Sequence, residues 1–177
     1  MTAMKRPVWI VAGVVVLAGL IAWLAFRGES ENVVVNFVDD FAKAVEKRPP
    51  GDETFSVADV TIAGATKRAI VTKNPSRIAW SVTVPENAWL IVSAGVKEEG
   101  WKIAGDGVSF RISMNDDEVL HMVMDPYGDP GDRKWNDLEV DLSEFAGETV
   151  NLFLKTFTGG NVDGDLPVWG EPRVIIR

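Results

Sequence analysis

Residues 77–96 have the sequence RIAWSVTVPENAWLIVSAGV, and this stretch decides the fold. From Arg77 to Val84 apolar and polar side chains alternate, which is the period-two pattern of a strand with one buried face. Pro85-Glu86-Asn87 is a turn signal, and Ala88 to Val96 is a second apolar run of strand length. The stretch therefore predicts two strands joined by a short turn.

The same pattern recurs on both sides of this stretch. Polar turns such as Asn74-Pro75-Ser76 and Gly105-Asp106-Gly107 separate the expected strands. Asp141 to Gly147 is expected to form a one-turn helix between two of them. About nine short strands with polar connections favour an antiparallel jelly-roll β-sandwich at residues 54–177. The further expected strands are Thr54 to Ile62, Lys67 to Lys73, Val108 to Met114, Glu118 to Met124, Leu138 to Asp141, Thr149 to Phe157 and Arg173 to Ile176.

Near the start of the chain, residues 8–26 have the sequence VWIVAGVVVLAGLIAWLAF, without a charged side chain. A helix of this length spans roughly 28 Å, close to the hydrocarbon core of a bilayer. The run predicts a transmembrane helix that follows a short terminus at residues 1–7. A cleavable signal peptide is the alternative, but Trp23 and Phe26 interrupt the small residues that a cleavage site needs.

The charges beside this span predict its orientation. Lys5 and Arg6 precede it, whereas Glu29 and Glu31 follow it closely. The positive-inside rule places the N-terminus in the cytoplasm and the rest of the chain outside. In a bacterium the protein would be a single-pass protein of the inner membrane with a periplasmic domain.

One face of the expected span has small side chains, at Ala18, Gly19, Ala22 and Ala25. Small residues allow transmembrane helices to approach closely, so this face is a candidate contact with other membrane subunits. An ordinary lipid-facing helix is the alternative.

Residues 29–47 are expected to form an amphipathic helix, because apolar residues recur at steps of three and four. Its packing face would consist of Val34, Phe37, Phe41 and Val45. Two interpretations are open: the helix packs on its own β domain, or it lies on a partner or the membrane interface. Packing against protein is favoured, because an acidic helix binds a membrane surface poorly. Residues 48–53, with Pro49-Pro50-Gly51, would form a short linker.

The charge of the chain excludes several classes of function. The net charge is −8, and from Gly28 onward 15 Lys and Arg face 26 Asp and Glu, which gives −11. So acidic a domain is a poor nucleic-acid binder, because phosphate contacts need clustered Lys and Arg. The chain has no cysteine, which excludes disulfides, thiolate catalysis and c-type haem attachment.

Several short segments between Arg68 and Arg173 together resemble a known module. The resemblance is to bacterial jelly-roll accessory modules with a galactose-binding-like fold, found in many envelope proteins. It implies a β-sandwich fold and leaves the ligand open. The segments are Arg68-Ala69-Ile70, Asn74 to Ile78, Val84-Pro85, Gly105 to Arg111, Lys134-Trp135, Val140 to Gly147 and Trp169 to Arg173.

Catalytic motifs are missing from the sequence. His121 is the only histidine, and there is no G-x-S-x-G elbow, Walker loop or dinucleotide fingerprint. We therefore expect a protein that is not an enzyme and holds no cofactor. Asn161-Val162-Asp163-Gly164-Asp165 supplies alternating oxygens that suit a structural calcium ion, but Leu166 and Pro172 depart from the EF-hand pattern.

Tryptophans supply the candidate contact residues. Trp80 lies in phase with Ile78 and Val82 and is expected in the core. Trp89 lies out of phase with its apolar neighbours, and Trp101 follows a glycine in a loop. Trp89 and Trp101 are the candidates for contact with a sugar ring or a partner protein.

The preferred function is a non-enzymatic, single-span accessory subunit of a larger membrane complex, with a respiratory or photosynthetic assembly as a conceivable host. The alternative is a membrane-tethered carbohydrate-binding module of the envelope. An envelope hydrolase of unrecognised type is the weakest of the three. Expected partners are the membrane, other subunits and a glycan, and not a nucleic acid.

Overall fold

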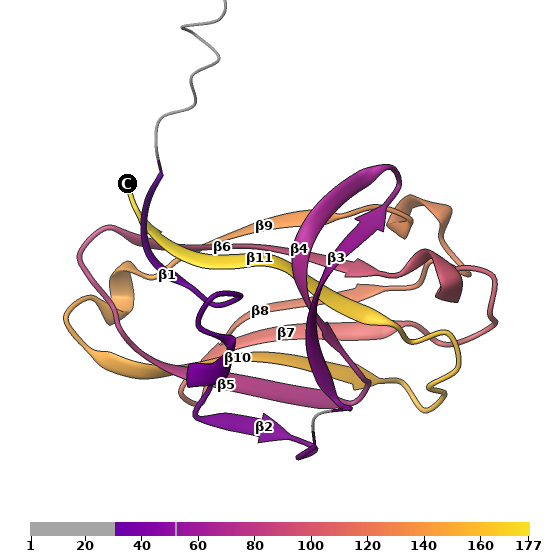
Figure 1. The fold of residues 1–177 in the computed structure, drawn as a ribbon, viewed down its shortest axis with the longest axis horizontal. Helices are drawn as coiled ribbons and strands as arrows, with labels where there is room; N and C mark the ends of the chain where they lie inside the picture. Colours follow the sequence, from indigo (N-terminus) through magenta and orange to yellow (C-terminus); the bar gives the residue numbers. More distant parts are fainter. Residues whose placement is uncertain (1–30, 52) are drawn as a thin grey trace, which may run out of the picture. The chain divides into compact units, whose positions relative to one another are not determined.

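All nine expected strands are present in the computed structural model, which describes residues 31–51 and 53–177 (Figure 1). The strand boundary that differs most from the prediction is the start of β11, which lies at Pro167 instead of Arg173. The strands are β1 (Asn32–Asn36), β2 (Glu46–Arg48), β3 (Phe55–Ile62), β4 (Ala65–Thr72), β5 (Ser76–Thr83), β6 (Ala88–Val96), β7 (Val108–Met114), β8 (Asp117–Met124), β9 (Asn136–Asp141), β10 (Thr149–Thr158) and β11 (Pro167–Ile176).

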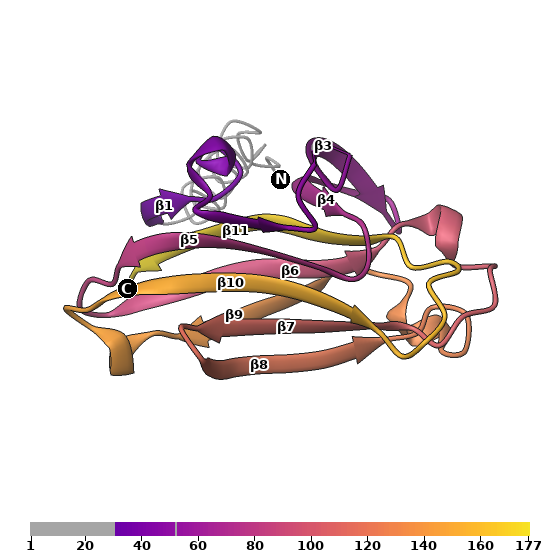
Figure 2. The ribbon, with the colours of Figure 1, turned by 90° about the horizontal axis from the view of Figure 1, so that it is seen from below.

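The strands form two antiparallel sheets that pack face to face (Figure 2). The six-stranded sheet has the order β3-β4-β11-β6-β9, and β1 pairs with the last part of β11. The five-stranded sheet has the order β2-β5-β10-β7-β8. From β4 onward the chain passes repeatedly between the sheets, which is the connectivity of a jelly roll. The mainly β, antiparallel sandwich is therefore confirmed.

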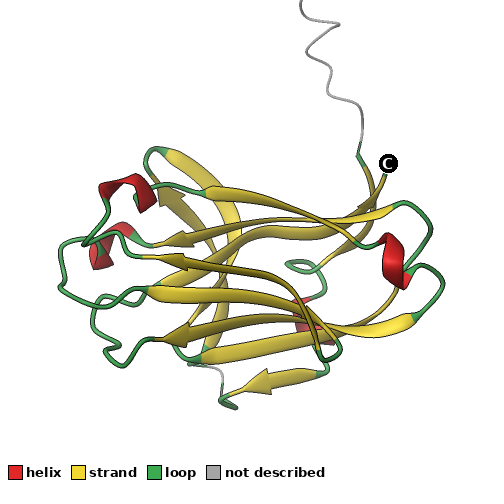
Figure 3. Ribbon diagram, turned by 180° about the vertical axis from the view of Figure 1, so that it is seen from behind, coloured by secondary structure: helices red, strands yellow, loops and turns green. Residues whose placement is uncertain are grey.

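Large apolar side chains fill the space between the sheets. Trp80 is buried, as its phase in β5 predicts, and Trp169 of β11 meets Phe110 of β7 edge to face at 5.0 Å. The one-turn helix expected after β9 is η4 (Ser143–Phe145), where the Ser143 amide donates to Asp141 Oδ1 at 2.9 Å. The other single turns are η1 (Phe41–Lys43), η2 (Glu98–Gly100) and η3 (Pro130–Asp132), in the connections between strands (Figure 3).

A second apolar cluster covers part of the outer face of the six-stranded sheet. The loop before β9 places Trp135 there, against Ile62 and Val168, and its indole Nε1 donates to the Ala65 carbonyl at 2.9 Å. The ring lies close to the sheet because Gly170 has no side chain: a Cβ there would come within 2.9 Å of the indole.

The prediction of an amphipathic helix at residues 29–47 is wrong for residues 31–47, the part of this range that the structure describes. Val33 to Val35 is β-branched, which favours a strand, and it lies in β1. Asn36 then turns the chain, since its Oδ1 accepts from the amides of Val38 and Asp39 at 3.0 and 3.3 Å. The segment continues through η1 into β2.

Of the four residues expected to form the packing face of that helix, two pack in or against the core and two are exposed. Phe37 is fully buried, with its ring 4.8 Å from that of Trp80, and Phe41 packs partly buried on the same core. Val34 and Val45 instead remain exposed, at 43% and 61%. Spacing alone therefore identified two of the four core contacts.

The sandwich begins at Asn32 and not at residue 54, because β1 pairs with β11 and β2 pairs with β5. Arg48, expected in a linker, belongs to β2. The expected transmembrane helix at residues 8–26, with its small-residue face, lies outside the described residues. Within the part of the chain that the structure describes, no helix is long and apolar enough to cross a bilayer.

Candidate functional site

The two tryptophans proposed as contact residues lie at opposite ends of β6. Trp89 is half-buried near its start, and the guanidinium of Arg177 lies 4.7 Å from the ring centroid. Trp101 follows η2, packs on both apolar clusters, and donates from Nε1 to the Val96 carbonyl at 2.8 Å. The structure does not bring the two rings into one site, and Trp101 anchors its own loop.

The loop expected to suit calcium is held by hydrogen bonds within the protein. Asp165 is 8% exposed and accepts from Asn74 Nδ2 at 2.6 Å, while the Asn161 amide donates to Asp106 Oδ2 at 3.0 Å. Burial raises the pKa of the Asp165 carboxyl, and the negative charges of Asp106 and Asp163 raise it further, against the lowering effect of the Asn74 bond.

No three acidic or histidine side chains among the described residues lie close enough to hold a metal ion. A structural calcium ion at this loop stays a prediction.

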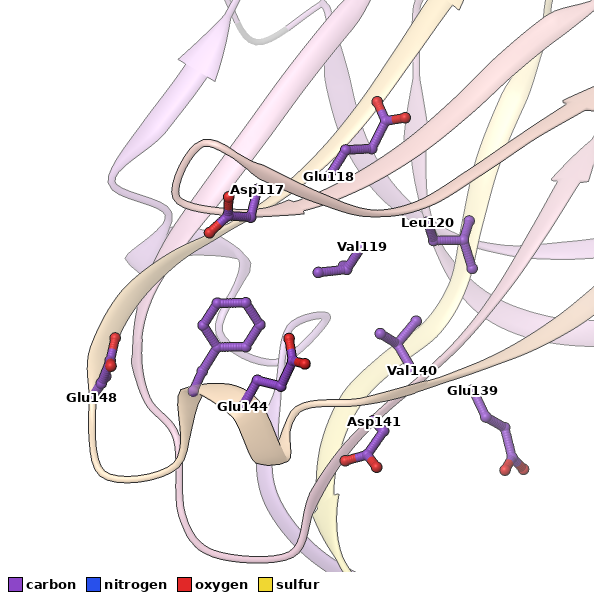
Figure 4. A pocket seen from close by; sticks show the side chains of 10 residues that line it. Asp117, Glu118, Val119, Leu120, Glu139, Val140, Asp141, Glu144 and Glu148 are labelled. Carbon is purple, nitrogen blue, oxygen red and sulfur yellow. The ribbon is translucent and has the colours of Figure 1, made fainter.

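A cleft of about 800 Å³ lies between β8 and β9, the edge strands of the two sheets. Val119, Leu120 and Val140 point into it, and carboxylates surround it (Figure 4). Carboxylates at this spread favour a cationic or strongly hydrated occupant and repel anions. The acidic residues that line the cleft are Asp117, Glu118, Glu139, Asp141, Glu144 and Glu148.

The outer face of the five-stranded sheet has the opposite character. One basic side chain from each strand lies in a single cross-strand line, which we call the basic row. The paired positions are Arg48 with Arg77, Arg77 with Lys155, Lys155 with Arg111, and Arg111 with His121. The row therefore crosses the sheet from β2 to β8, perpendicular to the strands.

Two phenylalanines lie on the same face of β10, one on each side of Lys155. The ammonium of Lys155 lies 4.9 Å from the Phe153 ring centroid, and the guanidinium of Arg111 lies 5.2 Å from that of Phe157. Phe157 is 40% exposed. Apolar rings beside hydrogen-bond donors form a surface that can stack on a sugar ring and bind its hydroxyl groups.

The basic face, meaning the basic row with Phe153 and Phe157, is open to solvent. The side chains of Arg77, Arg111 and His121 are 45%, 38% and 41% exposed. At its β2 end the face continues into a depression of about 400 Å³, lined by Pro49, Pro75 and Phe157 among others.

Sequence reasoning missed the basic row, although part of its signal was available. Arg77, Arg111 and Lys155 each occupy an outward position in a strand whose alternation is clear. Their alignment depends on the register between strands far apart in the sequence, which the alternation of single strands does not give.

No family model matches the chain. An uncharacterized protein of Archaeoglobus fulgidus is 31% identical over 153 residues, which cover 82% of this chain and 38% of that protein. The chain thus spans less than two-fifths of the curated relative that it matches.

Several solved structures that share the fold are carbohydrate-binding modules or contain them. The CBM51 of GH95 from Clostridium perfringens, in complex with methyl-galactose, has a TM-score of 0.58 at 16% identity and covers 80% of this chain and 98% of that one. CBM51-2 with the INT domains of Clostridium perfringens ZmpB, in complex with GlcNAc, has a TM-score of 0.57 at 12% identity. The match covers 75% of this chain and 30% of that one.

The tandem CBM51 modules of the family 98 glycoside hydrolase of Streptococcus pneumoniae have a TM-score of 0.56 at 15% identity, covering 81% of this chain and 47% of that one. At these identities the likeness shows the fold alone. It supports the galactose-binding-like jelly roll that the sequence resembles.

Proposed function

We propose that residues 32–177 form a carbohydrate-binding module that holds a glycan on the basic face without catalysis. The observation that carries the proposal is the pair Phe153 and Phe157 beside Lys155 and Arg111 on one open sheet face. The rings supply apolar area for a sugar ring, and the cations supply hydrogen-bond donors for its hydroxyl groups.

The fold neighbours support this proposal over the role of an accessory subunit. The printed descriptions of two of them include a bound sugar, methyl-galactose or GlcNAc. No observation on residues 31–51 and 53–177 points to a membrane complex. An extracytoplasmic position behind a membrane anchor fits a module that meets glycans, and it stays a prediction that rests on residues 8–26.

The test is a glycan array probed with the full chain in mild detergent, followed by titration of any glycan that binds. Phe157→Ala is expected to weaken binding at least about tenfold, because it removes the exposed ring and leaves the strand in place. Tyr127→Ala is the matched control, since Tyr127 is another exposed aromatic residue, at 52%, on the loop after β8.

Thermal unfolding of both variants must match the parent chain for the comparison to hold. Equal affinity of Phe157→Ala and the parent chain for every bound glycan would contradict the proposal, as would equal losses in the two variants. An array without any bound glycan would contradict it as well.

A further inference from the structure

The basic row is unusual for the charge of this chain. The chain has 18 Lys and Arg against 26 Asp and Glu, yet four of these cations and the only histidine stand in one line. Like charges placed directly opposite each other on neighbouring strands destabilise a sheet. A row of them is therefore costly unless an anion lies across it.

The protein supplies only part of the negative charge that the row needs. Glu46 Oε1 accepts from Arg77 at 2.6 Å and from Arg48 at 3.2 Å, at one end of the row. Glu118 lies 3.2 Å from Arg111 and 3.9 Å from His121, at the other end. Lys155, in the middle, contacts no carboxylate among the described residues and donates to Ser113 Oγ at 2.9 Å.

The geometry of the row sets the size of a matching ligand. Neighbouring strands lie about 4.8 Å apart, so a row across five strands extends over roughly 19 Å. A single sugar is much shorter than this. A polymer of several units, with an anionic group at intervals along it, could contact the whole row at once.

The acidic cleft limits how far such a polymer can extend. Glu118 lies at the border of both features: it pairs with Arg111 of the row and also lines the cleft between β8 and β9. In Figure 4 its carboxylate points away from the middle of the cleft. The potential therefore changes sign at β8, which disfavours a long, densely charged polyanion such as a nucleic acid.

We propose that the ligand of the basic face is an acidic oligosaccharide, with carboxylate or sulfate groups, lying across the strands from β2 to β8. This inference rests on the proposed function and adds the substrate class. Arg77, Lys155 and Arg111 bind the anionic groups as charge-assisted donors, and Phe153 and Phe157 pack against the sugar rings. Lys155 contributes most to selectivity, because its charge is the least compensated.

The experiment compares oligogalacturonate and sulfated galactan oligomers with neutral galactan oligomers of equal length, titrated into the full chain in neutral detergent. An acidic oligomer is expected to bind at least tenfold more tightly than the neutral one, with an affinity that falls as salt rises from 50 to about 500 mM. Galacturonic acid alone is expected to bind far more weakly than its oligomer.

Lys155→Gln and Arg77→Gln are expected to weaken binding of the acidic oligomer much more than binding of the neutral one, and so to remove most of the preference. Lys102→Gln, in an exposed loop, and Arg68→Gln are the matched controls and should keep the preference. Arg68 resembles Arg77 in exposure and ion pairing, since it lies 3.2 Å from Asp59, but it stands on β4 of the other sheet.

If the neutral oligomer binds as tightly as the acidic one and Phe157→Ala abolishes this binding, the inference of an acidic ligand is wrong and the proposed function stands. The inference is also wrong if Lys155→Gln and Arg77→Gln both keep the full preference for the acidic oligomer over the neutral one. A third contradicting result is binding to anionic lipid vesicles or single-stranded DNA that Lys155→Gln and Arg77→Gln weaken, while neither acidic oligomer binds. Failure of the proposed function itself differs from all of these: either no glycan in the array binds, or Phe157→Ala does not weaken binding more than Tyr127→Ala does.

Discussion

At the scale of single residues, Asp165 shows how an unfavourable charge is built into a loop. Its carboxyl is almost fully buried, and burial raises its pKa above the value near 3.9 expected in the unfolded chain. The folded protein therefore holds this proton more tightly than the unfolded chain. The stabilisation from protonation is complete below the unfolded pKa and is lost as the pH rises through the folded pKa.

We predict that Asp165→Asn raises the free energy of unfolding at pH 7, measured by urea denaturation in EDTA. The amide has no charge to bury, and its oxygen can still accept from Asn74 Nδ2. The gain should shrink as the pH falls through the raised pKa toward about 4, where the parent carboxyl is itself protonated. Asp163→Asn, exposed in the same loop, is the control with a smaller expected gain, because it removes only part of the repulsion on Asp165.

Destabilisation by Asp165→Asn at pH 7 in EDTA would show that the carboxylate itself is needed. The same samples test the calcium prediction. If calcium raises the stability of the parent chain and not of the variant, Asp165 is one of its ligands.

At the scale of elements, the segment from β1 to β2 has the clearest consequence. Phe37 contributes a fully buried ring against Trp80, and the Trp80 indole donates to the Asp40 carbonyl at 2.9 Å. The segment therefore belongs to the core and is not a linker. Its Phe37 amide also donates to the Pro172 carbonyl at 2.9 Å, which continues the pairing with β11.

We predict that Phe37→Ala lowers the free energy of unfolding by about 3 to 5 kcal/mol, the usual cost of a cavity left by a buried phenylalanine. Val45→Ala, from the same expected helical face but 61% exposed, should change it by less than about 0.5 kcal/mol. Urea denaturation of both variants gives the comparison. Similar small effects for both would contradict the observed placement of Phe37.

Sequence patterns predicted the strands well because alternation is a local property. Val108 to Met114 and Ala88 to Val96 match β7 and β6 at both ends, and the turn at Asp141 follows from a local hydrogen bond. The segment after Asn32 failed because its apolar spacing also fits a helix. What decided its structure was the free edge of β11, more than a hundred residues away in sequence.

The candidate site was hidden for a related reason. Trp89 and Trp101 were chosen as large aromatic residues out of phase with the core, and the structure places them at the two ends of β6. The basic row becomes visible only when the register of β5, β10 and β7 is known.

At the scale of the whole molecule, the limits of the folding unit can be tested. We predict that a fragment of residues 32–177 unfolds cooperatively, because both sheets and the core lie within it. A fragment of residues 54–177 lacks β1, β2 and Phe37, and exposes the edges of β5 and β11. It should unfold at a clearly lower temperature or aggregate.

Near-ultraviolet circular dichroism during a thermal scan measures both fragments. Equal midpoints for the two would mean that the first two strands contribute nothing to stability. A fragment of residues 32–177 without a cooperative transition would contradict the prediction in the other direction.

The pairing of β1 with β11 has a mechanical consequence. Asn32 lies opposite Ile176, so the first strand and the last strand of the sandwich end at the same corner (Figure 1). Tension applied between these two points acts along the hydrogen bonds that join the strands, since antiparallel bonds run perpendicular to the strand direction. The bonds then break one after another instead of sharing the load, and the domain opens from this corner under a small force.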